Sequence, residues 1–201
     1  MQTPHVSEII ISLDEVYEHV IFDDYQHIPM ATIPGMKDRT VTISSIGKTF
    51  SVTGWKTGWA IAAPELTQSL FRVHQFAIYS GVAPMQEAAA AALLTSQDYY
   101  DELAALYQGN RDYLIDVLAD VGLKPITPGG TYYIMVEIGH LDFSDDVAFC
   151  HHLTQNVGVA AIPPSAFYSN PADGAKLARF AFCKTRETLE AAAERLAVLK
   201  Q

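Results

Sequence analysis

A lysine within a segment rich in small polar residues is the first candidate for chemistry. Residues 44–59 read SSIGKTFSVTGWKTGW, and Lys48 follows an expected strand. Gly47 and Gly54 allow close backbone approach, and the neighbouring Ser and Thr hydroxyls are donors suited to an anion. Apolar flanks would desolvate the amine, lower its pKa and make it a nucleophile toward a carbonyl carbon. A solvated surface lysine is the alternative interpretation, because most lysines are exposed.

A carboxylate at the end of another expected strand is the second candidate. Asp14 follows the apolar run of residues 9–11, and Tyr17 comes three residues later. The carboxyl ends of parallel strands face the crevice in which such sheets bind ligands. Taken alone, Asp14 is more simply a turn or cap residue, and Tyr17 is more simply a packed aromatic with a satisfied hydroxyl. Asp14 therefore becomes a site candidate only in combination with Lys48.

Together, the lysine and the carboxylate suit one kind of cofactor. An aldehyde cofactor with a phosphate and a basic ring nitrogen requires a lysine for a Schiff base and a carboxylate for the nitrogen. Lys48 and Asp14 supply those two groups, and the hydroxyls of residues 44–53 supply donors for a phosphate. These residues therefore point to pyridoxal 5′-phosphate (PLP).

Four ordered motifs extend this indication along nearly the whole chain. They are SLDEVYEHVIF, SSIGKTFSVTGWKTGW, PGGTYYIM and ARFAFCKTRETLEAA. On these motifs the chain resembles the C-terminal half of class I/II aminotransferases, PLP enzymes of fold type I. The run GKTFSVTGWK, followed by RVHQ, is most similar to the kynurenine/glutamine/methionine aminotransferase group. The resemblance implies an α/β fold: part of the large domain with its mixed or parallel sheet, and an α+β small domain.

The resemblance implies cofactor-binding roles for five residues. Lys48 would be the catalytic residue and would form the Schiff base with PLP. Asp14 would pair with the pyridinium nitrogen, and Tyr17 would contact the phenolic oxygen of the ring. Ser45 and Lys56 would bind the phosphate. Many relatives have Arg at the position of Lys56, and Arg binds a phosphate through two parallel hydrogen bonds, whereas Lys acts as a point charge. The subgroup that this chain resembles commonly has Lys there.

Substrate binding is implied for two further residues. Arg179, in the motif ARFAF, would bind the α-carboxylate of the substrate through a charge-assisted fork. Taken alone, Arg179 would be an ion-pair or strand-edge residue, and the motif reverses that interpretation. Tyr132 would line the substrate pocket, with a core position as the alternative. His74, on an expected helix, is interpreted as structural.

Three functions stay open on these residues. The first is PLP-dependent transamination between an L-amino acid, which is aromatic or resembles methionine or glutamine, and a 2-oxo acid. The second keeps the cofactor but gives β-elimination from sulfur-bearing amino acids, as in a cysteine-conjugate C–S lyase. The third is a non-catalytic fragment or interaction module, because full-length family members are longer and part of the phosphate site would lie outside this chain.

Composition excludes several classes of protein and partner. The 201 residues carry a formal net charge of −10 without a basic stripe, which argues against a nucleic-acid partner. No apolar run is long enough to cross a bilayer. Cys150 and Cys183 are expected to be reduced core residues, and they offer too few ligands for a metal site. The expected partners are the amino-acid and 2-oxo-acid substrates and, from the resemblance, a second copy in a homodimer.

The first residues bear on the compartment. MQTPHVSEII has neither the basic region nor the apolar stretch of a signal peptide. The default expectation is therefore a cytoplasmic protein.

Alternating strands and helices must position these groups. We expect strands at residues 9–11, 19–22, 41–46 and 59–63 in a parallel sheet, and then a helix from Pro64. Further along, we expect helices at residues 87–94, 98–121, 144–156 and from 185 onward, and strands at 132–138, 159–162 and 177–182. Ser144 is the expected N-cap of the third of these helices, and Gly122 the expected end of the second. The predicted domains are a partial large PLP-binding domain, residues 1–95, and a small C-terminal domain with its connecting helix, residues 96–201.

Overall fold

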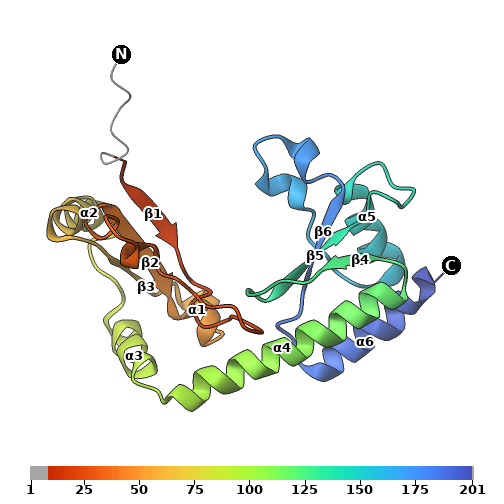
Figure 1. Cartoon of the computed structure of the whole chain (residues 1–201), viewed down its shortest axis with the longest axis horizontal. Helices are drawn as coiled ribbons and strands as arrows, with labels where there is room; N and C mark the ends of the chain where they lie inside the picture. Colours follow the sequence, from red (N-terminus) through yellow and green to blue (C-terminus); the bar gives the residue numbers. More distant parts are fainter. Residues whose placement is uncertain (1–8, 201) are drawn as a thin grey trace. The chain divides into compact units, whose positions relative to one another are not determined.

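The structure, a computed structural model, describes residues 9–200 (Figure 1). The chain divides into two compact units, Met1–Glu102 and Leu103–Gln201. The division falls within the long helix α4 (Gln97–Asp120). Each unit contains one three-stranded sheet together with helices, so the predicted α/β class is confirmed.

The first unit is built on a mixed sheet in the order β1-β2-β3. Strand β1 (Ile11–Asp14) pairs in parallel with β2 (Thr40–Ser45), and β3 (Gly58–Ile61) pairs with β2 in antiparallel orientation. Of the two sheet types expected, mixed or parallel, the structure shows the mixed one, because β3 is antiparallel. Two short helical turns, α1 (Ile46–Thr49) and η4 (Thr53–Trp55), reverse the chain after β2, whereas a parallel pair needs a long crossover.

Two expected strands of the first unit differ in the structure. Strand β1 begins only at Ile11, and Ile9 and Ile10 are exposed by 59% and 58%. Residues 19–22 contain a turn and a single bridge instead of a strand. Val20 and Phe22 are nevertheless buried. The apolar pattern therefore predicted correctly that these side chains are buried, but it predicted wrongly that they lie in a strand.

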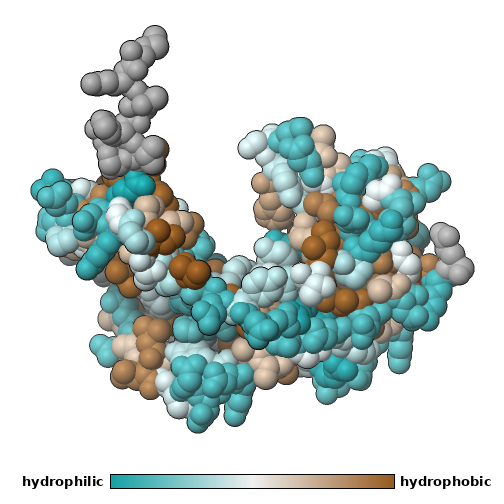
Figure 2. Space-filling view, in the orientation of Figure 1, coloured by the Kyte–Doolittle hydropathy of each residue, from teal (hydrophilic) through white to brown (hydrophobic). Residues whose placement is uncertain are grey.

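Two helices follow the first sheet, as predicted. They are α2 (Pro64–Ala77), which starts with Pro in its first turn, and the alanine-rich α3 (Ala83–Leu93). No residue of α2 is buried, and Phe71 and Phe76 are exposed by 59% and 88%. Brown patches on this unit in Figure 2 mark exposed apolar surface. The first unit therefore leaves much of its apolar surface uncovered.

The second unit has an antiparallel sheet with helices α4, α5 (Asp146–His152) and α6 (Arg186–Leu196). The strand order is β4 (Lys124–Ile126), β5 (Tyr133–Glu137) and β6 (Leu177–Ala181). The core includes the fully or almost fully buried side chains of Ile134, Val136, Ala178, Phe180 and Phe182. They alternate along β5 and β6, as expected when one face of a sheet is buried.

Strand β4 was not expected, because its central residue is Pro125. Proline lacks the N–H group of a strand ladder and is confined to edge strands, and β4 is an edge strand of three residues. The expected strand at residues 159–162 is also wrong. Only Ile162 bridges there, to Arg179, through reciprocal backbone hydrogen bonds of 3.0 Å.

Helix ends in the second unit follow their capping chemistry. The N-cap of α5 is Asp145 and not Ser144, because the Asp145 Oδ1 accepts the Ala148 N–H at 2.8 Å. That hydrogen bond is the main cause of a lowered Asp145 pKa. Of the two threonines that could cap α6, Thr185 and Thr188, the structure uses Thr185, which accepts the Thr188 N–H at 3.4 Å. Gly122 has a φ of +82°, the left-handed conformation that ends many helices.

Two further expectations concern the chain as a whole. Across residues 9–200, no helix combines the length and the apolar character needed to cross a membrane. Both cysteines are free thiols, Cys150 buried and Cys183 half-buried. Desolvation by burial, with a smaller contribution from the Asp146 charge, raises the pKa of Cys150 to about 11.

Candidate active site

Lys48 lies on a short helix directly after strand β2. Ser45, the last residue of β2, is the N-cap of α1, and its Oγ accepts the Gly47 N–H at 3.2 Å. The side chain of Ser45 thus ends the strand and begins the helix on which Lys48 is half-buried. Gly and Thr are weak helix formers, so this single turn depends on its cap.

A cavity of about 580 Å³ in the first unit brings several predicted groups together. Its lining includes Ser45, Lys48 and Lys56, three residues expected to hold the cofactor. Thr53 and Thr57 add hydroxyl groups to the same cavity. Two amines and several hydroxyls form a donor set that suits a phosphate, since all of them can donate hydrogen bonds and the amines carry positive charge.

Two backbone features shape this cavity. A Cβ atom at Gly58 would lie 2.5 Å from the Ser44 carbonyl oxygen and 2.9 Å from the Ser45 Cβ, so only glycine fits opposite Ser45 in the sheet. Lys56 has a φ of 54°, in the left-handed region that residues with a Cβ seldom adopt. The exposed Lys56 therefore reaches the cavity from a constrained turn, which is common where a chain is shaped around a ligand.

His74 also lines this cavity, from helix α2. Its sequence position predicted a structural role, because a histidine on a helix has no local pattern that marks it as a site residue. Only the approach of α2 to the turn between β2 and β3 brings it there.

Asp14 and Tyr17 are not among the residues that line this cavity. Asp14 is the last residue of β1 and is exposed, with its Oδ1 accepting the Val16 N–H at 3.2 Å. In the parallel register Asp14 is opposite Ile43, and Ile43 lines the cavity. Tyr17 is half-buried in the following turn.

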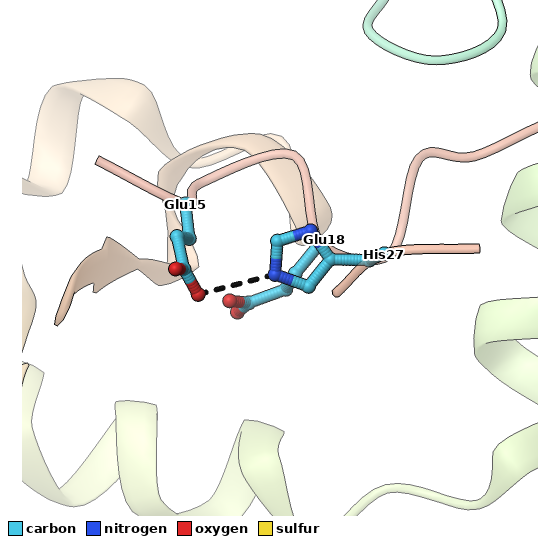
Figure 3. Close-up of side chains that lie close together, drawn as sticks. All are labelled: Glu15, Glu18 and His27. Carbon is cyan, nitrogen blue, oxygen red and sulfur yellow. Dashed lines mark hydrogen bonds and ion pairs between the residues drawn. The ribbon is translucent and has the colours of Figure 1, made fainter. Parts of the chain in front are cut away.

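A polar cluster that the sequence did not indicate lies in the same turn. Glu15, Glu18 and His27 bring their carboxylate oxygens and a ring nitrogen within 4.8 Å of one another (Figure 3). The Glu15 Oε2 and His27 Nε2 atoms are 3.1 Å apart, and the dashed line in Figure 3 joins them. The Glu15 Oε1 accepts the Met30 N–H at 3.0 Å, and the Glu18 Oε1 accepts the Ser44 hydroxyl at 2.9 Å. A cation at this cluster would compete with these hydrogen bonds.

The two predicted substrate residues lie in the second unit. Arg179 is in β6, with its guanidinium carbon 4.8 Å from the ring centroid of Tyr133 and 5.0 Å from that of Phe167. Both distances are in the range of cation–π contacts, which fix the plane of the guanidinium group. Tyr132 is half-buried just before β5, and its carbonyl oxygen accepts the Phe182 N–H at 2.9 Å.

A second cavity, of about 490 Å³, lies in the second unit between β6 and α6. Its walls are mostly apolar, and its lining includes Ala181, Leu189 and Arg195 but none of the predicted site residues. The Arg195 Nη1 already donates to the Gly158 carbonyl oxygen at 2.8 Å. The chemistry of the lining therefore favours the cavity at Lys48 as the candidate active site.

Comparisons with known proteins bear on the family of the chain. The sequence profile of "Aminotransferase class I and II" matches residues 3–196. Kynurenine–oxoglutarate transaminase of Dictyostelium discoideum is 39% identical over 98% of this chain and 50% of its own length. Methionine aminotransferase of Escherichia coli is 40% identical over 94% of this chain and 49% of its own length.

Solved structures give the same family. N-Succinyldiaminopimelate aminotransferase from Mycobacterium tuberculosis superposes with a TM-score of 0.90 at 41% identity, over 94% of this chain and 50% of that chain. The chain spans about half the length of the curated relatives it matches. Its fold is that of the fold type I aminotransferases. The profile match over most of the chain and these relatives show that the chain belongs to the class I and II aminotransferase family.

Proposed function

We propose that this chain carries the catalytic lysine and part of the substrate site of a PLP-dependent aminotransferase, which exchanges the amino group of an L-amino acid with a 2-oxo acid. The observation that carries the proposal is the cavity lined by Ser45, Lys48 and Lys56. A family that is generally PLP-dependent supports the choice of cofactor.

The residues present fit this cofactor. Lys56 and Ser45, with the hydroxyl of Thr53, offer positive charge and donors to the phosphate. The missing Cβ of Gly58 leaves room beside Ser45. Asp14 and Tyr17, which follow β1, are proposed to contact the pyridinium nitrogen and the phenolic oxygen.

The proposed chemistry assigns a proton or a charge to each residue. When bound, PLP supplies an aldehyde carbon that links to an amine and a protonated ring that accepts the electrons left when the substrate loses its α-proton. Lys48 Nζ would be the nucleophile toward that carbon, and once released it would take the proton from the substrate Cα as a general base. The Asp14 carboxylate would hold the proton on the ring nitrogen by charge and hydrogen bonding.

Substrate binding is proposed for Arg179 and Tyr132. The rings of Tyr133 and Phe167 lie within cation–π distance of the Arg179 guanidinium, whose N–H groups can bind a carboxylate in a fork. In residues 9–200, Arg179 has no carboxylate partner in the protein. The proposed substrate is an aromatic, methionine-like or glutamine-like amino acid. Kynurenine and methionine appear in the names of relatives and support the first two classes, and the third follows from the family resemblance alone.

A homodimer and a cytoplasmic location complete the proposal. The homodimer follows from the family resemblance alone. Two free thiols suit a reducing compartment, where disulfides are rare.

Covalent capture of the cofactor tests the proposal directly. The chain incubated with PLP should develop a visible absorption band, and borohydride reduction should fix one cofactor on the peptide that contains Lys48. Lys48→Ala should lose both signals, while Lys37→Ala, which changes an exposed lysine, should retain them. A wild-type chain without any adduct in excess PLP would leave only the non-catalytic interpretation.

Product analysis separates the two catalytic functions. A transaminase converts an added 2-oxo acid to its amino acid, whereas a C–S lyase releases ammonia and pyruvate from a cysteine conjugate. For a transaminase, Arg179→Ala should raise KM for the amino acid more than it lowers kcat. A loss confined to kcat would contradict the carboxylate role of Arg179.

A further inference from the structure

Glu15 is a buried carboxylate at the start of the turn that follows β1. Its side chain is only 3% exposed. One oxygen accepts the Met30 N–H and the other lies 3.1 Å from His27 Nε2, so Glu15 ties the turn to the loop of residues 27–30. The Glu15 N–H also donates to the Ile43 carbonyl oxygen at 2.8 Å. The backbone of Glu15 is thus hydrogen-bonded to β2, and its side chain is hydrogen-bonded to the loop of residues 27–30.

Glu18 makes a second tie from the same turn. Its Oε1 accepts the hydroxyl of Ser44, a residue of β2 that is only 3% exposed. Ser44 lines the cavity and directly precedes Ser45. The Glu18 N–H donates to the Glu15 carbonyl oxygen at 3.0 Å, so the two glutamates are held in one turn.

The position of these two contacts matters because each glutamate directly follows a predicted cofactor-binding residue. Asp14 immediately precedes Glu15, and Tyr17 immediately precedes Glu18. Asp14 itself is exposed at the end of β1. Buried hydrogen bonds to a charged carboxylate are among the stronger polar contacts in proteins, so they can hold an exposed neighbour in place.

We propose that Glu15, with Glu18, is a positioning residue that holds Asp14 and Tyr17 in register with the cavity at Lys48. This inference rests on the proposed function, because Asp14 is taken to face the ring nitrogen of PLP. It assigns no chemical step to Glu15. Glu15 acts through Asp14, and Glu18 acts through Ser44.

The test compares Glu15→Ala with Glu15→Gln in the full chain loaded with PLP. Two quantities are measured: the dissociation constant of PLP and the pH midpoint of the visible absorption band. Asp14→Asn is the reference for a ring nitrogen that has lost its carboxylate. Glu15→Ala should weaken PLP binding about tenfold and move the midpoint in the same direction as Asp14→Asn does, by a smaller amount.

Glu15→Gln should restore most of the wild-type behaviour. The amide oxygen can still accept the Met30 N–H, and the amide N–H₂ can donate to the ring nitrogen of His27. Glu65→Ala, at an exposed glutamate in the first turn of α2, is the matched control and should change neither quantity. Should Glu15→Ala not fold, His27→Ala is the second variant. It removes one of the two side-chain contacts of Glu15 and should move the pH midpoint in the same direction.

The outcomes separate this inference from the proposed function. A wild-type chain that forms no band with PLP overturns both. If the wild type forms a band but Glu15→Ala and His27→Ala leave its midpoint unchanged, only the positioning role is overturned. If Glu15→Ala lowers the unfolding midpoint in urea but leaves the absorption band unchanged, the positioning role is also overturned, because a glutamate that only stabilises the fold would give that result.

Discussion

The two units each contain a three-stranded sheet but stabilise it differently. Among residues 9–200, the buried apolar side chains of the first unit are few: Val20, Phe22, Val41, Ile46 and Ala89. Those of the second unit are far more numerous and include most inward-facing residues of β5 and β6. In the first unit, several large apolar side chains of α2 are exposed instead.

The comparison indicates how each unit positions its site residues. Around β1 and β2, hydrogen bonds of buried polar groups add to the small apolar core, such as Glu15 with the Met30 N–H and Glu18 with the Ser44 hydroxyl. In the second unit a continuous apolar core lies behind Arg179 in β6. Hydrophobic burial is the dominant stabilising contribution to folding, so we expect the second unit to be the more stable one.

The largest expected effect is a core truncation in the second unit. Phe182 is fully buried, and Phe182→Ala should lower the free energy of unfolding of this unit by about 3–5 kcal/mol. Phe76→Ala, at a side chain of the first unit that is 88% exposed, should change stability by only about 0.5 kcal/mol or less.

Two optical probes can follow the units in urea. Trp55 and Trp59 are the only tryptophans and both lie in the first unit, so their fluorescence follows that unit. Far-UV circular dichroism follows the helices of both. Equal losses for Phe76→Ala and Phe182→Ala would contradict the difference between the two units.

Thiol reactivity offers the next largest effect. Burial raises the pKa of Cys150 from an ordinary value of 9.0 to about 11, so its thiolate fraction near neutral pH should fall about a hundredfold. Iodoacetamide followed by peptide mass spectrometry should therefore label the half-buried Cys183 first in the folded chain. In urea both should react at similar rates. Early labelling of Cys150 would show that the core of the second unit opens readily.

A buried amide gives a smaller effect in the same unit. The Asn110 side chain is almost fully buried and donates to the carbonyl oxygens of Phe182 and Lys184, at 3.3 and 2.9 Å. Asn110→Ala would leave both oxygens without this donor and should cost about 1–3 kcal/mol by circular dichroism in urea. Asn156→Ala, at an exposed position, is the control. A cost as small as that of Asn156→Ala would show that water replaces the lost donor.

The smallest expected effect is a pH dependence in the first unit. Burial lowers the pKa of His19 below its ordinary value of 6.5; nearby Glu18 opposes the shift and His27 adds to it. The unfolded chain then binds the proton more readily, so the stability of this unit should fall as the pH drops below about 6.5. The effect is modest because the side chain is 38% exposed.

Tryptophan fluorescence in urea at about pH 7.5 and about pH 5.5 measures this dependence. His19→Gln should reduce the difference between the two pH values, and His151→Gln on the exposed side of α5 should leave it unchanged. An unaltered difference in His19→Gln would assign the dependence to another group.

Local chemistry was read correctly from the sequence where neighbours in the chain decide the outcome. The threonine at residue 185 caps a helix, the glycine at 122 ends one, and proline at 64 starts one, as their side-chain and backbone preferences predict. The ordered motifs also identified the family, because several residues that would bind one cofactor and its substrate occur in the family's order and spacing. The roles of the site residues stay predictions.

Tertiary structure alone decided the features whose partners are distant in sequence. Glu15 and His27 are 12 positions apart, and Ser44 and Glu18 are 26 apart, so no periodicity links them. The antiparallel course of β3 and the rings around Arg179 likewise depend on how remote segments pack. The sequence by itself determined which groups are available and the local structure around them, because short-range sterics and hydrogen bonds act between neighbours. Which groups meet was decided by long-range packing and by buried hydrogen bonds, which no local pattern reports.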